Sequence, residues 1–145
     1  METVMKPIGV IRTPFTDPSQ APIQPSRSQA EGTVEVDAAY EEGLEDLEGF
    51  SHIILLYLFH CSSGYSLKVK PFLDDRQRGL FSTRYPCRPN PIGLSVVRLV
   101  GRKGRVLHIS GADMLDATPL LDIKPYVPKF DAPPDVRIGW LEHRA

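Results

Sequence analysis

Short runs in which apolar and polar residues alternate recur along the chain, and this period of two predicts β-strands. Strands are predicted over residues 6–13, 32–37, 51–60, 94–100 and 106–109. The third run is the most apolar and fits a buried strand. A turn at residues 101–104 separates the last two runs, so we expect a β-hairpin there. Ile123 and residues 136–141 are predicted to be edge strands.

One helix is predicted over residues 38–47, because Tyr40, Leu44 and Leu47 fall on one face. A long loop is predicted over 17–28, and a polar connection over 72–80. Many short strands, 11 glycines, 14 prolines and one helix favour a mainly β fold. We expect a single-domain β-barrel with one or two short helices. No GxGxxG motif follows a first strand, so a Rossmann-type fold is not predicted.

The length of 145 residues corresponds to one domain, residues 1–145, which can bury a hydrophobic core. No apolar run approaches the roughly 18 residues of a membrane-spanning helix. The first residues lack the pattern of a secretory signal, so we expect a cytoplasmic protein with no membrane partner. Cys61 and Cys87 lie far apart and form no CxxC motif, which predicts reduced thiols and neither a disulfide nor a metal site.

The net charge of −1 conceals an uneven distribution of charged residues. Residues 1–67 hold three Lys/Arg and ten Asp/Glu, whereas residues 68–105 hold ten Lys/Arg and two Asp. An anionic partner near the central segment is one explanation. The other is a solvated basic face that balances the acidic first part, and charge alone does not separate the two.

Residues 82–95, STRYPCRPNPIGLS, hold three prolines, each of which lacks an N–H group and has a fixed φ. Each proline also pushes the preceding residue toward an extended conformation. The segment is therefore predicted to be a stiff loop that presents Arg84, Arg88 and Asn90 at the start of a strand. A rigid loop with fixed polar groups is typical of a binding site formed before its ligand arrives.

A second segment, residues 113–126 (DMLDATPLLDIKPY), also mixes apolar residues with fixed polar ones. Together with IGVIRTPF at 8–15 and RPNPIGLS at 88–95, it resembles the TsaA-like family, the TrmO-type tRNA methyltransferases that use S-adenosylmethionine. The resemblance runs from residue 8 to residue 128, which is almost the whole chain. The RPNPIGLS run and LLDIKPY at 120–126 are its most specific parts.

The resemblance implies a β-barrel that binds S-adenosylmethionine without a Rossmann fold. It implies a homodimer with the active site near the subunit interface. It also implies a tRNA partner and N6-methylation of threonylcarbamoyladenosine next to the anticodon. Methyl transfer is an in-line displacement in which orientation alone can contribute roughly 7–11 kcal/mol. No general base is assigned, because a nitrogen acceptor can lose its proton after the transfer.

The resemblance makes Arg84 a cofactor-binding position. Its guanidinium suits the methionine carboxylate of the cofactor, with which it can form two parallel hydrogen bonds. A surface ion pair with Asp74 or Asp75 is the alternative explanation for Arg84. Leu94 matches a family position that contacts the cofactor through its backbone, and a core leucine is compatible with that role.

Pro22, Ile23 and Gln24 match a Pro-x-Gln element that lines the cofactor site in the family. Gln24 offers one acceptor and two donors for an adenine edge. His60 and Cys61 match a His-polar pair that contacts the cofactor. Cys61 departs from the polar pattern, so we expect a backbone contact there. Without the resemblance, a strand-end histidine bonded to a nearby carbonyl explains His60 better.

Residues 115–118 resemble a Leu-Asp-Gly-Thr element that touches the cofactor, which assigns contacts to Leu115, Asp116, Ala117 and Thr118. Ala117 replaces the glycine, and alanine costs about 1 kcal/mol if that position has a positive φ. Asp116 is expected to bind a ribose hydroxyl or to help neutralise the sulfonium. A turn-forming role for Asp116 before Thr118 is an equally good explanation without the resemblance.

Five further residues are candidates for substrate contact: Arg88, Asn90, Asp122, Lys124 and Tyr126. The first two lie on the stiff loop, although an asparagine between two prolines can also simply cap its own turn. The other three alternate, so in a strand they share one face. On that face they could bind substrate or act as an acid/base pair, and a solvated strand face is the alternative.

Two other classes of function stay open. The first is an S-adenosylmethionine-binding β-barrel that acts on a small molecule or lacks tRNA methylation activity. The mildly acidic net charge and the lack of an appended RNA-binding domain favour it, since RNA binding usually needs a basic surface. The second is a β-barrel interaction protein, which leaves both stiff polar segments without a role.

Overall fold

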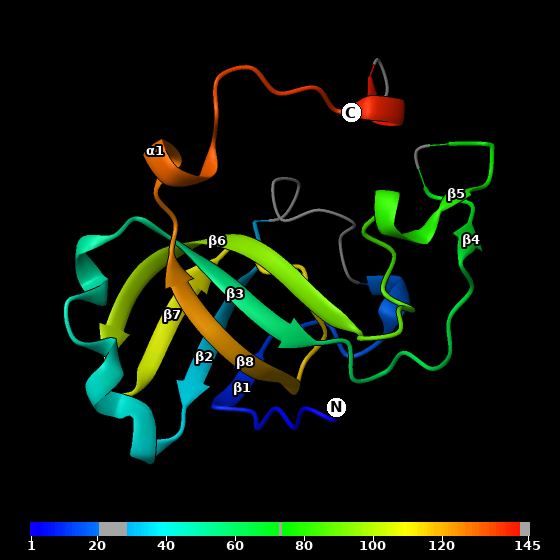
Figure 1. The fold of residues 1–145 in the computed structure, drawn as a ribbon. Coiled ribbons are helices and arrows are strands. Elements are labelled where there is room, and N and C mark those ends of the chain that lie inside the picture. Colours follow the sequence, from blue (N-terminus) through cyan, green and yellow to red (C-terminus); the bar gives the residue numbers. More distant parts are fainter. Residues whose placement is uncertain (21–28, 73, 143–145) are drawn as a thin grey trace.

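The computed structural model describes residues 1–20, 29–72 and 74–142, and six of their strands close into an antiparallel barrel (Figure 1). The order around the barrel is β1-β2-β7-β6-β3-β8. The bounds are β1 Gly9–Arg12, β2 Glu31–Val36, β3 His52–Leu58, β6 Ile92–Lys103, β7 Val106–Ser110 and β8 Thr118–Pro125. The mainly β barrel is therefore confirmed, and β6 and β7 form the predicted hairpin.

The barrel interior holds the hydrophobic core because successive strand residues point alternately inward and outward. In β3 every second residue is buried, so Ile53, Leu55 and Tyr57 point inward. Other buried apolar side chains come from the remaining strands and their connections: Ile11, Val34, Val36, Leu44, Val97, Leu99, Leu107, Ile109 and Leu120. Among the residues that the structure describes, Ser95 and Thr118 are the buried polar exceptions.

The helical segments are single turns or little more. They are η1 Pro18–Gln20, η3 Ala38–Leu44, η4 Leu47–Gly49, η5 Leu80–Ser82, α1 Pro128–Asp131 and η6 Gly139–Leu141. The helix expected over 38–47 is wrong in type, because it consists of two 3-10 turns. Asp46 separates them with a left-handed φ of 71°. Within η3, Leu44 packs into the core while Tyr40 stays 40% exposed. Gly43 and the neighbouring acidic side chains disfavour a longer α-helix.

Two strand predictions and one predicted connection need correction. The strand around Ile123 is not an edge, because β8 lies between β1 and β3 and closes the barrel. Its polar residues lie on the outer face, which explains why its pattern resembled an edge strand. Residues 136–141 form no strand. Within 72–80, β5 Arg78–Gly79 pairs with β4 Lys68–Val69 in a small hairpin beside the barrel, and strands of two residues are too short to show a periodicity (Figure 1).

The strand β6 changes its pairing halfway along its length. Residues 92–98 pair with β3, whereas pairing with β7 starts at Arg98 and continues to Lys103. No described strand pairs with the other edge of residues 92–97. We call this gap, between residues 92–97 and the segment 111–117 that follows β7, the barrel opening. It leaves backbone groups of β6 outside any described ladder, where a ligand can use them.

Glycine at position 93 is required by the packing at the barrel opening. A Cβ atom on Gly93 would lie 2.3 Å from Cε2 of Tyr57 and 2.9 Å from the Phe59 ring. The two rings pack edge to face with centroids 5.5 Å apart, and Tyr57 is buried. The Tyr57 ring therefore has little room to move aside.

We expect Gly93→Ala to lower the free energy of unfolding by about 1–3 kcal/mol, because it overpacks the interior. Chemical denaturation followed by circular dichroism measures this loss. Gly101→Ala in the same strand is the matched control, because no atom lies within 4 Å of its added Cβ. An equal loss in both variants would contradict the explanation.

Candidate functional site

Three side chains form a hydrogen-bonded chain across the barrel opening. The Tyr57 hydroxyl lies 2.7 Å from Oγ of Ser95, and Ser95 donates to Oδ1 of Asp113 at 2.7 Å. Because the single hydroxyl hydrogen of Ser95 is directed to the carboxylate, the Tyr57 hydroxyl donates to Ser95. This hydrogen-bonded chain of side chains joins β3, β6 and the segment after β7, so it fixes both sides of the opening.

The protonation behaviour of this chain follows from its burial. Burial raises the pKa of Asp113 to about 6, although the Ser95 hydrogen bond and the charge of Arg84 favour the ionised form. Burial and the Asp113 carboxylate raise the pKa of Tyr57 well above its usual range. Arg84 lowers both pKa values, so its guanidinium lies close enough to act on both groups. The loop of residues 82–91 leads directly into β6, whose Ser95 is hydrogen-bonded to Asp113 of the segment 111–117.

The two cofactor-binding candidates on and after the proline-rich loop lie at the opening. Arg84 is exposed and, among the described residues, forms no ion pair with Asp74 or Asp75, while Asp74 pairs with Arg78. The Leu94 side chain is 46% exposed on the outside of the barrel, so Leu94 is not a core leucine. Its backbone belongs to the half of β6 that borders the opening.

The proline-rich loop is braced by more than its prolines. Nη1 of Arg88 donates to the carbonyls of Thr83 at 3.0 Å and Tyr85 at 2.9 Å. The Arg88 guanidinium also lies over the Phe81 ring, 5.8 Å from its centroid. Arg88 is thus a brace of the loop in this structure, while its contact with substrate stays a prediction.

The end of the same loop is tied to the end of β3. The Phe59 N–H donates to the Pro91 carbonyl at 2.8 Å, directly before the turn that holds His60 and Cys61. His60, Cys61 and Asn90 are all exposed here. The structure therefore brings these three candidates together at one end of the barrel.

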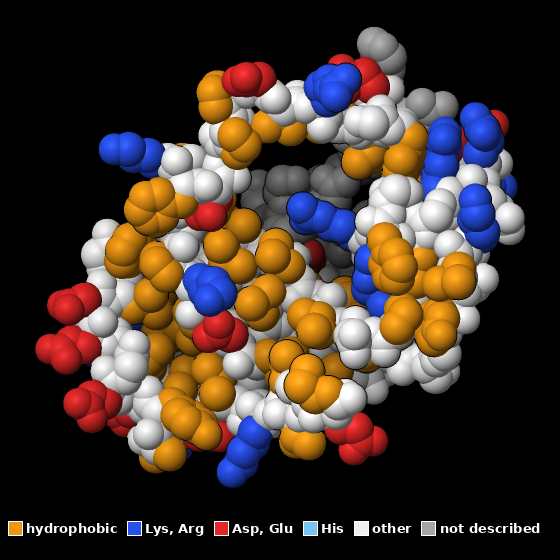
Figure 2. Space-filling model, in the orientation of Figure 1, with side chains coloured by type: hydrophobic (Ala, Val, Ile, Leu, Met, Phe, Trp, Pro, Cys, Tyr) orange, Lys and Arg blue, Asp and Glu red, His pale blue; other side chains and the backbone are white. Residues whose placement is uncertain are grey.

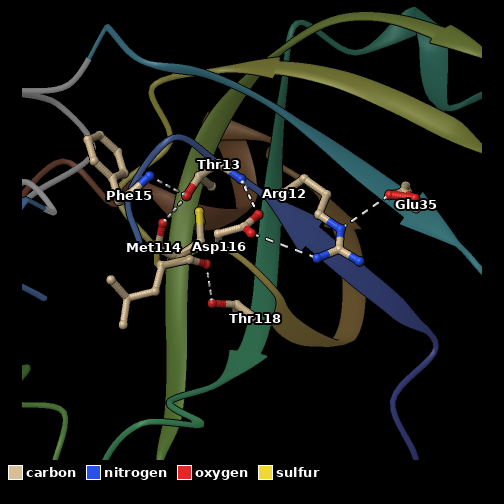
Figure 3. Close-up of polar contacts among 8 residues, drawn as sticks. Arg12, Thr13, Phe15, Glu35, Met114, Asp116 and Thr118 are labelled. Carbon is tan, nitrogen blue, oxygen red and sulfur yellow. Dashed lines mark hydrogen bonds and ion pairs between the residues drawn. The ribbon is translucent and has the colours of Figure 1, made fainter. Parts of the chain in front are cut away.

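The Asp116 carboxylate is engaged within the folded chain (Figure 3). It accepts a hydrogen bond from the Thr13 N–H at 3.1 Å and lies 3.8 Å from Nη1 of Arg12. Arg12 also pairs with Glu35 at 3.5 Å, and the Asp116 N–H donates to the Phe15 carbonyl at 2.7 Å. Asp116 thus fastens its segment to the end of β1, and its contact with the cofactor stays a prediction.

The backbone of the same segment is strained at Ala117. Its φ of 65° lies in the left-handed region, which confirms that this position suits glycine. Thr118 beside it is buried, and its hydroxyl donates to the Leu115 carbonyl at 2.6 Å. This bond and those of Asp116 hold the turn in shape.

The remaining substrate candidates, Asp122, Lys124 and Tyr126, lie on β8 or directly after it. Nζ of Lys124 lies 3.3 Å from Oδ2 of Asp122, so the two share a face of β8 as predicted. Tyr126 follows β8 and donates its N–H to the His52 carbonyl. From there β3 extends ~20 Å to its other end at the opening. Within one subunit the run from Asp122 to Tyr126 therefore leads away from the opening.

The sequence also led to predictions about a Pro-x-Gln element, the two cysteines, metal binding and membrane spans. Pro22, Ile23 and Gln24 lie outside the described residues. Cys61 and Cys87 are free thiols in the structure, Cys61 exposed and Cys87 half-buried. In the described ranges, no group of three or more His, Cys, Asp or Glu is placed to hold a metal ion. No helix of those ranges is long and apolar enough to cross a membrane.

The sequence reasoning missed Tyr57, Ser95 and Asp113. A signal was present for Ser95, because it is a polar residue at an inward position of a strand whose other inward residues are apolar or glycine. A buried hydroxyl needs a partner, which directs attention to the facing strand and loop. Asp113 lies in the connection three residues after the end of β7, so it carries no such periodic signal.

Comparisons with known proteins agree with one another. Residues 10–132 match the family described as the tRNA-methyltransferase O N-terminal domain. A probable S-adenosyl-L-methionine-binding protein of Pyrococcus abyssi is 57% identical over 138 residues, which are 94% of this chain and 75% of that protein. The tRNA (adenine(37)-N6)-methyltransferase of Rattus norvegicus is 36% identical and matches 96% of this chain, which spans 34% of that protein.

A solved structure is similar in fold as well as in sequence. The crystal structure of TrmO from Pseudomonas aeruginosa matches with a TM-score of 0.82 and 45% identity, over 96% of this chain and 62% of that one. The chain thus spans about a third of the rat enzyme and less than two thirds of the Pseudomonas protein.

The half-buried carboxyl of Asp113 gives a testable pH dependence. The pKa of Asp113 is about 6 in the folded chain against 3.8 for an unperturbed aspartate, so the folded state holds this proton more tightly. Its contribution to stability is therefore greatest at acidic pH and is lost as the pH rises through about 6.

Asp113→Asn should remove this part of the pH profile, which urea unfolding from about pH 4 to 7 would record as a flatter curve. Asp135→Asn, which changes an exposed carboxylate in the C-terminal segment, should leave the wild-type profile intact. An unchanged profile in Asp113→Asn would contradict the assignment.

Proposed function

The chain belongs to the family of the tRNA-methyltransferase O N-terminal domain, and we propose that it binds S-adenosylmethionine and methylates N6 of threonylcarbamoyladenosine next to the tRNA anticodon. The Ser95–Asp113 hydrogen bond carries the proposal, because it ties the segment 111–117 to the strand that the Arg84 loop enters, at the opening of a non-Rossmann barrel. The name of the Pyrococcus relative supports the cofactor, and that of the rat relative supports N6 of adenine 37 in tRNA as the acceptor, while the threonylcarbamoyl group is part of the proposal alone. A tRNA substrate also agrees with the expected cytoplasmic location.

The residues at the opening fit the charged and polar groups of S-adenosylmethionine, which supplies an electrophilic methyl group on a sulfonium. Arg84 offers a guanidinium that can bind the carboxylate with two parallel hydrogen bonds. Asp113 is mostly ionised at neutral pH, so its negative charge complements the sulfonium. The backbone of Leu94 lies beside the opening and offers hydrogen-bonding groups.

The chain contributes to catalysis mainly by binding and orientation. Arg88 and the Phe59–Pro91 hydrogen bond hold the Arg84 loop in shape before any ligand arrives. A preformed loop loses less conformational entropy on binding, which leaves more of the interaction energy for alignment. We include His60, Cys61 and residues 115–118 among the proposed cofactor contacts, because they lie at the same end of the barrel or border the opening.

A small-molecule methyl acceptor is the second candidate. The net charge of −1 favours it, because RNA binding usually depends on a basic surface. Both candidates share the cofactor and the barrel opening, so the acceptor alone distinguishes them.

We also propose a homodimer that forms through the outer face of β3 and β6. On β6 the side chains of Ile92, Leu94 and Val100 are 38%, 46% and 59% exposed. Figure 2 shows hydrophobic side chains over much of the face that β3, β6 and β8 present. Exposed apolar sheet faces of this kind mark protein interfaces. A partner on this face would lie next to Asp122 and Lys124, which could then contribute to the partner's active site.

Arg84→Ala should weaken S-adenosylmethionine binding by about 10- to 150-fold, because it removes charge-assisted hydrogen bonds to the carboxylate. Isothermal calorimetry measures the affinity. Arg84→Lys keeps the charge but loses the two parallel hydrogen bonds, so its affinity should lie between those of the wild type and Arg84→Ala. Arg137→Ala, at an exposed position of the C-terminal segment, should bind as the wild type does.

The methyl acceptor is tested with radiolabelled S-adenosylmethionine and two tRNA samples, one with and one without threonylcarbamoyladenosine. We expect label only in the modified tRNA. Cofactor binding without label in either sample would favour the small-molecule acceptor. Neither binding nor transfer would overturn the proposed function.

Val100→Asp should shift the mass in light scattering from dimer to monomer, because it places a charge on the outer face of β6. Val136→Asp is the matched control, since both valines are 59% exposed and Val136 lies in the C-terminal segment. A wild-type protein that is monomeric at all concentrations would rule out the proposed dimer.

A further inference from the structure

Charge is divided between the barrel and one segment that projects beside it. Residues 60–91, which we call the basic lobe, hold six Lys/Arg and two Asp, so the formal charge of the lobe is +4. The rest of the chain holds eleven Lys/Arg and sixteen Asp/Glu, a formal charge of −5. A cationic projection on an anionic body attracts polyanions to that projection in particular. The net charge of −1 therefore does not describe the surface that a ligand meets.

The cationic side chains of the lobe are available at its surface. Lys68, Lys70 and Arg76 are exposed on and around the β4–β5 hairpin. One of the two acidic residues, Asp74, already pairs with Arg78. Figure 2 shows the Lys and Arg side chains gathered over β4 and β5, with hydrophobic side chains close by.

The same lobe exposes an unusual number of large apolar side chains. Tyr65, Leu67, Phe72, Phe81 and Tyr85 are 57%, 60%, 68%, 73% and 42% exposed. Unpaired RNA bases stack on exposed aromatic rings, at about 1–3 kcal/mol per base, while cations hold the phosphates. The combination fits a single-stranded RNA loop. A second copy that packs lobe against lobe fits less well, because two lobes of charge +4 repel each other.

The lobe also starts and ends at the barrel opening. His60 follows β3, Pro91 precedes β6, and the Phe59 N–H joins the two ends by its bond to the Pro91 carbonyl at 2.8 Å. An RNA loop on the lobe therefore lies next to the end of the barrel where β3 ends and β6 begins.

We propose that the basic lobe binds the phosphates and unpaired bases of the tRNA anticodon loop and presents the target nucleotide to the barrel opening. This inference rests on the proposed function and adds the surface by which the substrate is held.

The first test removes three lobe charges with Lys68→Ala, Lys70→Ala and Arg76→Ala in one variant. Fluorescence anisotropy gives the Kd for tRNA between about 50 and 200 mM KCl. The slope of log Kd against log salt should fall by about 2–3, and affinity at the lowest salt should fall at least tenfold. The matched control removes Lys6, Lys103 and Lys129, which are exposed elsewhere, and should keep the wild-type slope. Equal losses in both triple variants would overturn the lobe as the RNA surface.

The second test concerns stacking. Phe72→Ala should weaken tRNA binding by about 5- to 150-fold without changing the salt slope. Phe130→Ala on α1 is the control, because Phe130 is 79% exposed outside the lobe. If Phe72→Ala instead changes the mass in light scattering and leaves tRNA affinity intact, the lobe is a protein interface and the inference is wrong.

The outcomes separate this inference from the proposed function. Calorimetry with S-adenosylmethionine should show unchanged affinity in the lobe variants, which also confirms that they fold. A wild type that methylates tRNA, together with a triple lobe variant of unchanged tRNA affinity, would sink the inference alone. A wild type that binds the cofactor but neither binds nor methylates tRNA would sink both.

Discussion

The hydrogen bond from Ser95 to Asp113 is the interaction on which the barrel opening depends. At this end β6 has no described strand partner on the side toward β7, so the segment after β7 is held there by side chains. The Ser95 side of the bond is buried, and a buried hydroxyl without a partner costs about 1–3 kcal/mol. Tyr57 completes the chain and rests on Gly93, where a larger residue does not fit. The hydrogen bonds among Tyr57, Ser95 and Asp113 therefore link the packing of the core to the shape of the opening.

The loops around the opening gain their rigidity from separate sources that support the same geometry. Arg88 holds the loop of Arg84 from within, and Asp116 fastens the other segment to β1. Both residues were candidates for ligand contact, and both are already engaged in the folded chain. Groups that are fixed in this way cannot adapt to many ligands, but they lose little entropy when the right one binds. The exposed guanidinium of Arg84 thus belongs to a braced loop, which suits a residue that must meet a charged group at a fixed place.

The sequence predicted what depends on periodicity and on proline, and it missed what depends on distance across the barrel. The barrel strands, the β6–β7 hairpin and the stiff loop follow from alternation and fixed φ angles, which are local properties. The sequence did not predict that β8 is a full strand of the barrel. Its outer pair, Asp122 and Lys124, is exposed, whereas its Leu120 points into the core, and these two sides of the strand exist only once the barrel closes. Tyr57 and Asp113 lie 56 positions apart, and no local pattern relates them. Ala117 was the exception, since a single substitution in a motif indicated a left-handed backbone that the structure has.

One strand, β6, carries three different environments along a few residues. Its inward residue Ser95 belongs to the hydrogen-bonded chain, its free edge borders the barrel opening, and its outward side chains form the apolar face that we propose as a dimer interface. Because side chains alternate along a strand, a shift of one residue in its register would exchange the inner and outer sets and destroy all three at once. The loop that precedes β6 ends in prolines and is bonded to Phe59, which holds the register at the point where β6 begins. The rigidity of the proline-rich loop therefore serves the strand as much as the site, and this explains why one short stretch of sequence is the most informative about both.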